Sequence, residues 1–267
     1  MKNIQKRIRT IHERMQIHWH PFFRESNATH PDFRQYKFLI NNCTMISEEH
    51  KFIYCRVPKA ANSTVMATLV YAQTGFKSDD YHAMKDMRAK CFSRITESNI
   101  SREGARRDYF KLSIVRHPFS RIISTFNDKA LDVSRYNEIV RGRIKPYVND
   151  ARDVCDIFEE FLAKLEHTDI TIRNYHYAPQ TKIMAFHPSE LDYIGRVESL
   201  DTDLPYIMHR IFGASPPVIE WSPHAASNGF KPRERKMRVE MLSQRQKDRL
   251  YNVYRDDFDF LGYERDL

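Results

Sequence analysis

Glycine is scarce in this chain, with 7 among 267 residues, and this scarcity excludes long flexible linkers and low-complexity tracts. No stretch is apolar over the length of a membrane span or of the apolar part of a signal peptide. If the chain is complete, we therefore expect a cytoplasmic protein without a transmembrane segment. Apolar residues make up 41% of the sequence, which predicts a substantial core.

Two families of motif are also missing. The four cysteines form no C-x-x-C pair and have no ligand spacing with histidine, so the sequence predicts no metal site. The Walker A pattern G-x-x-x-x-G-K-[ST] is absent, which argues against ATP hydrolysis at a magnesium-binding P-loop.

Positive charge is in excess, with 43 basic against 35 acidic residues and a net charge of +8. Such a balance favours polyanionic partners, although the charge is scattered along the chain. Residues 1–20 have the pattern of a basic amphipathic helix, which we expect to pack on its own domain. Peripheral contact with a membrane and a role in dimerisation stay open, so the protein is either a monomer or a homodimer. Residues 21–50 are predicted to be mostly loop.

Apolar strands that alternate with helices dominate the rest of the sequence. Residues 51–57 and 108–115 read as buried strands, and a third short strand begins the stretch 191–213. Helical patterns follow each of them, at 63–73 after the first strand and from Pro118 after the second. Further helices are predicted over 153–167 and 242–263. This order predicts one α/β domain, a three-layer sandwich with a central parallel sheet.

The first turn, "RVPKAANST", joins a strand end to a helix start, which is where open α/β sheets bind ligands. Backbone N–H groups from Ala61 to Thr64 and the helix dipole suit a phosphate or sulfate. Lys59 adds a positive charge, Ser63 and Thr64 add hydroxyls, and Ala60 leaves room near the backbone. The alternative is an ordinary capped helix with a surface lysine.

The second turn, "SIVRHPFSRIISTF", places Arg116 at a strand end and Ser124 about one turn into the following helix. An arginine and a serine hydroxyl can hold a phosphate together, although a surface salt bridge is the alternative for one such turn. Two anion sites at neighbouring strand ends predict a ligand with phosphates at both ends.

Several segments in this order resemble the PAPS-dependent carbohydrate sulfotransferases related to the chondroitin, dermatan and HNK-1 enzymes. These segments are "RVPKAANST" (56–64), "IVRHPFSRIISTFNDK" (114–129), "YHYAPQT" (175–181), "LDYIGRVESLDTDL" (191–204) and "LYNVYRDDFDFLGY" (250–263). The resemblance covers roughly residues 50–263. One departure is Asn62, which stands where the family often has serine or threonine.

The resemblance implies a P-loop NTPase-like sulfotransferase fold over 50–267. Residues 1–49 lie outside the resemblance, and we expect them to form a helical or loop arm packed on this domain. The resemblance also implies PAPS as the donor, PAP as the product, and a hydroxyl acceptor, usually on a carbohydrate. By this likeness Lys59 and its turn would hold the 5′-phosphosulfate, and Arg116 with Ser124 the 3′-phosphate. The residues implied to contact the donor are Arg56, Pro58, Lys59, Ala60, Ala61, Asn62, Ser63, Thr64, Arg116, Ser124, Arg196 and Ser199.

Sulfuryl transfer places negative charge on the leaving oxygen, and Lys59 is the expected group to neutralise it, without a metal. The acceptor hydroxyl needs a general base. In relatives, the general base is often a residue of the segment between the two phosphate turns. In this sequence that segment contains His82, which is the first candidate. His176 is the next candidate, although it could be structural, and Glu97 is the third.

Two other functions compete with this interpretation. A non-catalytic basic protein that binds nucleic acid or anionic lipid would not explain Lys59, Arg116 and Ser124 at strand ends, and no nucleic-acid motif is present, so we expect no nucleic-acid partner. A nucleotide kinase with a degenerate loop lacks its G-K-[ST] sequence. The acceptor itself cannot be named from the sequence.

Overall fold

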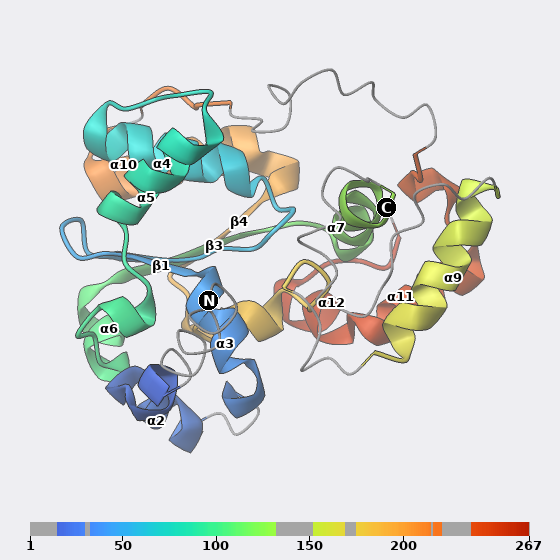
Figure 1. Ribbon diagram of the computed structural model, residues 1–267, viewed down its shortest axis with the longest axis horizontal. Coiled ribbons are helices and arrows are strands. Elements are labelled where there is room, and N and C mark those ends of the chain that lie inside the picture. The colour runs from blue at the N-terminus through green and yellow to red at the C-terminus, as the bar shows by residue number, and fades with distance from the viewer. Residues whose placement is uncertain are drawn as a thin grey trace, which may run out of the picture.

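The protein is described by a computed structural model over residues 15–29, 33–131, 152–168, 175–214, 216–220 and 236–266. A four-stranded sheet lies at its centre, with helices on both faces (Figure 1). The strands are β1 (Thr44–Ser47), β2 (Phe52–Cys55), β3 (Phe110–Val115) and β4 (Tyr193–Arg196), in that spatial order. The pairs β2–β3 and β3–β4 are parallel, so the α/β sandwich expected from the sequence is confirmed.

The structure corrects the prediction for residues 21–50. This region is not mostly loop but forms α2 (Pro21–Thr29), α3 (Phe33–Cys43) and β1, which pairs antiparallel with β2. Pro21 begins α2, a position where a missing N–H is harmless, so this proline marks the start of a helix instead of a loop. The sheet is therefore mostly parallel, with one antiparallel strand at its edge.

Of the helix expected over 1–20, residues 15–20 are described, and 15–19 of these are helical. Ile17 is buried, whereas Met15 and Trp19 are exposed. None of the helices in the described ranges combines the length and the apolar composition that crossing a membrane requires.

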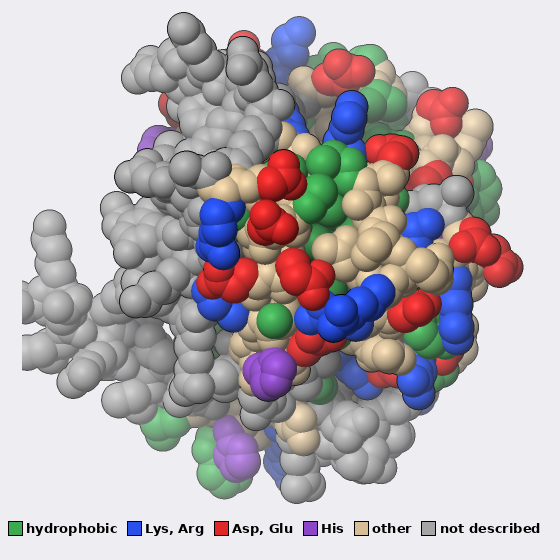
Figure 2. Space-filling model, turned by 90° about the vertical axis from the view of Figure 1, so that its right-hand side faces the viewer, with side chains coloured by type: hydrophobic (Ala, Val, Ile, Leu, Met, Phe, Trp, Pro, Cys, Tyr) green, Lys and Arg blue, Asp and Glu red, His purple; other side chains and the backbone are tan. Residues whose placement is uncertain are grey.

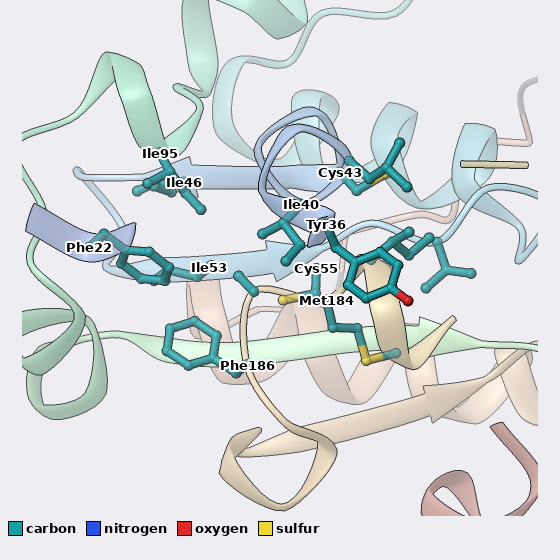
Figure 3. Close-up of a cluster of buried hydrophobic side chains, with 14 of the residues drawn as sticks. Phe22, Tyr36, Ile40, Cys43, Ile46, Ile53, Cys55, Ile95, Met184 and Phe186 are labelled. Carbon is teal, nitrogen blue, oxygen red and sulfur yellow. The ribbon is translucent and has the colours of Figure 1, made fainter. Parts of the chain in front are cut away.

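The side chains of β2 alternate between two cores. Phe52 and Tyr54 pack with α4 (Asn62–Thr74) and α10 (Leu200–Phe212) on one face. Ile53 and Cys55 pack on the other face with residues of α2, α3 and the 183–186 segment, as the close-up in Figure 3 shows. Burial on both faces explains why the sequence of this strand is continuously apolar.

The remaining elements complete the two faces and one end of the sheet. They are α5 (Tyr81–Cys91), η1 (Ile95–Glu97), α6 (Arg102–Asp108), α7 (Pro118–Thr125), η2 (Phe126–Ala130), α9 (Val154–Glu166), η4 (Thr181–Ile183), η5 (Pro188–Glu190), η6 (Val197–Ser199), η7 (Val239–Met241), α11 (Gln244–Val253) and α12 (Arg255–Leu261). Helices α7, α9, α11 and α12 share a third apolar core. They lie beyond the carboxyl ends of the parallel strands (Figure 1).

The N-terminal helices are tied to this body by Arg102 of α6. Its buried guanidinium donates to Ser26 Oγ at 2.9 Å and to the Ala185 carbonyl at 2.8 Å, and it pairs with Glu190 at 2.7 Å. The rings of Phe22 and Phe186 lie against it. This buried, paired charge contacts α2 through Ser26 and the 185–190 segment through Ala185 and Glu190, and so holds α2 against that segment.

The turn after β2 uses a left-handed backbone without glycine. Lys59 has a φ of 68° and Ala61 a φ of 48°. This region costs a residue with a Cβ about 1–2 kcal/mol, so the surrounding contacts must hold the turn in place.

We expect the substitution Ala61→Gly to raise the free energy of unfolding by up to about 1 kcal/mol, because glycine removes this strain. Urea denaturation measures the change. The neighbouring Ala60 is buried and does not have a positive φ, so Ala60→Gly is the matched control and should lower stability. A less stable Ala61→Gly protein would show that the turn is not strained.

Candidate active site

The N-terminus of α4 is an anion-binding surface. None of the described side chains caps the helix, and Ala61 at the N-cap position has no polar side chain. The N–H groups of the first turn are therefore available, because an α-helix leaves its first donors without intrahelical partners. The hydroxyls of Ser63 and Thr64 are half-buried and hydrogen-bond to none of the described residues. Together with the helix dipole, these donors suit a phosphate or sulfate.

Lys59 precedes this helix start in the same turn, and its side chain reaches η2, a single turn of π-helix that follows α7. Its ammonium Nζ lies 3.2 Å from Oδ2 of Asp128. The Nζ of Lys129 lies 3.5 Å from the same oxygen. Two ammonium groups thus contact the same carboxylate oxygen.

Arg116, at the end of β3, lies against the turn of Lys59. Its Nη1 donates to the carbonyl of Lys59 at 3.3 Å. Gln180 fixes the backbone of Arg116, accepting from its N–H at 3.0 Å and donating to its carbonyl at 2.8 Å. Burial lowers the pKa of Arg116, and the carboxylate of Glu198 opposes this shift. The two turns singled out in the sequence therefore meet in one place.

Ser124 belongs to α7, the helix that starts directly after Arg116 and His117. It is half-buried, and its hydroxyl hydrogen-bonds to none of the described residues. It is thus available to a ligand held at the β3 end.

Arg121 of α7 joins the parts of this site, and the sequence did not single it out. Its side chain is 1% exposed. It donates to the carbonyls of Pro58 at 3.0 Å, Ala178 at 2.8 Å and Tyr175 at 3.1 Å. The signal that could have found it is an arginine followed directly by the apolar residues of a buried helix face.

His176 lies beside the cluster of Lys59, Asp128 and Lys129. Burial lowers the pKa of His176 well below its ordinary value of 6.5, the ammonium groups of Lys129 and Lys59 lower it further, and Asp128 opposes them. Burial and the two ammonium groups therefore favour the neutral form of the imidazole. Its ring packs on Tyr175 at a centroid distance of 4.3 Å.

The other two candidate bases lie apart from these contacts. His82 is the second residue of α5, is exposed, and has its ring 5.5 Å from that of Tyr81. Within the described ranges, no hydrogen bond or ion pair joins His82 to Lys59 or His176. Glu97 is exposed in η1, where its carboxylate accepts from the N–H of Arg94 at 3.0 Å.

Arg196 and Ser199, predicted to line the nucleotide pocket, are engaged with protein groups. Ser199 donates to Oδ2 of Asp203 at 2.7 Å. Arg196 donates to the Leu261 carbonyl at 2.6 Å and lies over the ring of Tyr263 at 4.3 Å. These contacts hold the end of β4 against the C-terminal turn, and a role in donor binding stays a prediction for both residues.

Three further residues of the predicted donor set differ in what they contact. Arg56 donates to the Asn42 carbonyl of α3 at 2.8 Å, and Pro58 supplies a carbonyl to Arg121. Oδ1 of Asn62 is buried and has no hydrogen-bond partner among the described residues. A buried polar atom of this kind is expected to find a partner in a ligand or in water.

Gln180 and Asp257 act on the site through the backbone, since Gln180 hydrogen-bonds Arg116 and Asp257 hydrogen-bonds Gln180. Neither residue was assigned a role from the sequence. Both oxygens of the buried Asp257 carboxylate are used, one by the N–H of Gln180 at 2.8 Å and the other by the N–H and hydroxyl of Thr181. Burial raises the pKa of Asp257, and the positive charge of Arg121 opposes the shift. Among the described residues, no group of three or more histidine, cysteine, aspartate or glutamate side chains could hold a metal ion.

The chain was compared with known proteins. A model of the sulfotransferase family matches residues 42–264. Carbohydrate sulfotransferase 14 of Danio rerio is 31% identical over 179 residues, which cover 62% of this chain and 47% of that protein. Carbohydrate sulfotransferase 10 of Rattus norvegicus is 28% identical and that of Homo sapiens 27%, each over 86% of this chain and 68% of the relative. The match thus spans about half of the first relative and about two thirds of the others.

No solved structure gives a significant match. The family match includes both turns, the Arg121 helix and the His176 segment, and it extends over most of the sequence. The protein belongs to the sulfotransferase family.

Proposed function

We propose that this protein transfers the sulfuryl group of PAPS to a hydroxyl of a carbohydrate acceptor. The observation that carries the proposal is the hydrogen bond from Arg116 to the carbonyl of Lys59, because it brings both predicted phosphate sites together. The carbohydrate sulfotransferases among the relatives support this acceptor class.

The donors available in the site fit the two ends of PAPS. The N–H groups at the start of α4, with Ser63 and Thr64, suit the 5′-phosphosulfate. Arg116 and Ser124 suit the 3′-phosphate, which a guanidinium can bind through two parallel hydrogen bonds. The hydroxyls of Ser63, Thr64 and Ser124 have no hydrogen-bond partner among the described residues, so they are available to a ligand.

In the proposed reaction, an acceptor oxygen attacks sulfur while the bond from sulfur to the bridging oxygen of PAPS breaks. The electron pair of that bond stays on the 5′-phosphate of PAP, and Lys59 neutralises the charge. The acceptor proton goes to a general base, for which we favour His176 over His82 because His176 lies beside Lys59 and is neutral. Lys59, Lys129 and the α4 dipole supply positive charge, so we propose a transfer without a metal.

The alternative of a basic protein that binds nucleic acid or lipid draws no support from the surface in Figure 2. Acidic and basic side chains are mixed on that face, whereas a nucleic-acid site needs a continuous basic patch. Cytoplasmic location, peripheral membrane contact and a monomeric or homodimeric state remain predictions.

We expect PAP to raise the melting temperature and ATP with magnesium to have no such effect. At a concentration of 100 times the dissociation constant, binding stabilises the folded state by about 2.7 kcal/mol. Unchanged melting with PAP, together with salt-sensitive binding to DNA, would support the alternative.

Lys59→Ala should lower transfer of labelled sulfate by about 10²–10³-fold with the fold intact, because one preorganised cation is lost. Lys164→Ala, on the outer helix α9, is the matched control and should retain activity. If Lys59→Ala keeps full activity, Lys59 has no part in the chemistry.

The pH dependence of turnover identifies the base. With His176, the neutral form is lost only as pH falls through its lowered pKa, so we expect the acidic limb of kcat well below pH 6.5. His176→Gln should lower kcat by about 10²–10⁴-fold, and His82→Gln should leave it unchanged. The opposite result for the two variants would assign the base to His82.

A further inference from the structure

Asp128 faces the catalytic lysine directly, and nothing in the proposed reaction uses it. Its Oδ2 lies 3.2 Å from Nζ of Lys59 and 3.5 Å from Nζ of Lys129. The three side chains are only partly accessible, with 16% of Asp128, 23% of Lys59 and 7% of Lys129 exposed. Partial burial weakens screening by water, so these charges interact more strongly than a surface pair would.

Asp128 lies in a π-helical turn, and hydrogen bonds to a distant segment fix this turn. The π-helical turn η2 ends with the N–H of Leu131 donating to the Phe126 carbonyl at 3.1 Å. Such a turn changes the direction of the side chains that follow it and is frequent at functional sites. Asn127 donates to the Met237 carbonyl at 2.8 Å and accepts from the Met237 N–H at 3.0 Å, which fixes the turn.

A carboxylate at this place affects the donor in two opposing ways. It repels the sulfate and phosphate groups that Lys59 is to bind, and it competes with them for the ammonium group. It also fixes the direction of a long side chain that otherwise has many rotamers. Lys129 stays next to Asp128 when Lys59 turns to the donor, so the carboxylate keeps one counter-ion.

We propose that Asp128 is a positioning residue, an internal counter-ion that holds Lys59 in place before the donor binds and then gives it up to the donor. This inference rests on the proposed function, since it takes Lys59 as the group that binds the leaving oxygen. Asp128 thus weakens donor binding and increases turnover.

The test uses Asp128→Asn, which removes the charge and keeps the size of the side chain. We expect PAP to bind about three- to tenfold more tightly in calorimetry, and kcat for labelled sulfate transfer to fall about tenfold or more. A residue that only supports the fold would give the opposite sign for binding, because its loss loosens the site. Glu160→Gln is the matched control, since Glu160 also accepts from two cations, Lys164 and Arg152, but on the outer helix α9.

Equal or weaker PAP binding in Asp128→Asn, or an unchanged kcat, would overturn the role of Asp128 while the wild type still binds PAP and transfers sulfate. A wild type that binds no PAP would instead overturn the proposed function, and this inference with it. If Asp128→Asn melts well below the wild type, Asp128→Ser is measured in its place and must show the same tighter binding and slower turnover.

Discussion

The buried guanidinium of Arg121 is the contact on which the geometry of the site depends. It donates to the carbonyl of Pro58 in one segment and to the carbonyls of Tyr175 and Ala178 in another, and these two segments are far apart in the sequence. Burial lowers the pKa of Arg121, and the charge of Asp257 opposes this effect. A buried charge is tolerated only when its donors are satisfied, so these backbone segments are held in one arrangement. The turn of Lys59 and the segment of His176 thereby keep a fixed relation.

The site is rich in positive charge, but most of its cations already have a protein partner. Arg116 donates to a carbonyl, and Lys59 lies against Asp128. The donors without a partner among the described residues are the N–H groups at the start of α4 and the nearby hydroxyls. An anionic donor would therefore first meet neutral hydrogen-bond donors and then exchange partners with the cations. The carboxylate of Asp128 offsets the repulsion between the two ammonium groups that contact it.

Local patterns in the sequence predicted the strands β2, β3 and β4, the two turns and their meeting, because parallel neighbouring strands end at the same edge of a sheet. Long-range packing decided what the patterns missed. The antiparallel pairing of β1 depends on α3, which the prolines and asparagines of residues 21–50 concealed. The role of Arg121 depends on carbonyls supplied by distant segments, and the direction of Asp128 depends on a π-helical turn. Our preference for His176 over His82 as the proposed base likewise uses the positions of Lys59 and Lys129.

The antiparallel strand β1 has a consequence for shortened forms of the chain. It covers the outer hydrogen-bonding edge of β2, which is apolar on both faces. Removal of residues before 50 would leave that edge open to pairing with other molecules, and uncovered edges of this kind promote aggregation. It would also remove the hydrogen bond from the Arg102 guanidinium to Ser26 Oγ. A soluble, minimal catalytic fragment therefore has to retain the helices that precede β1.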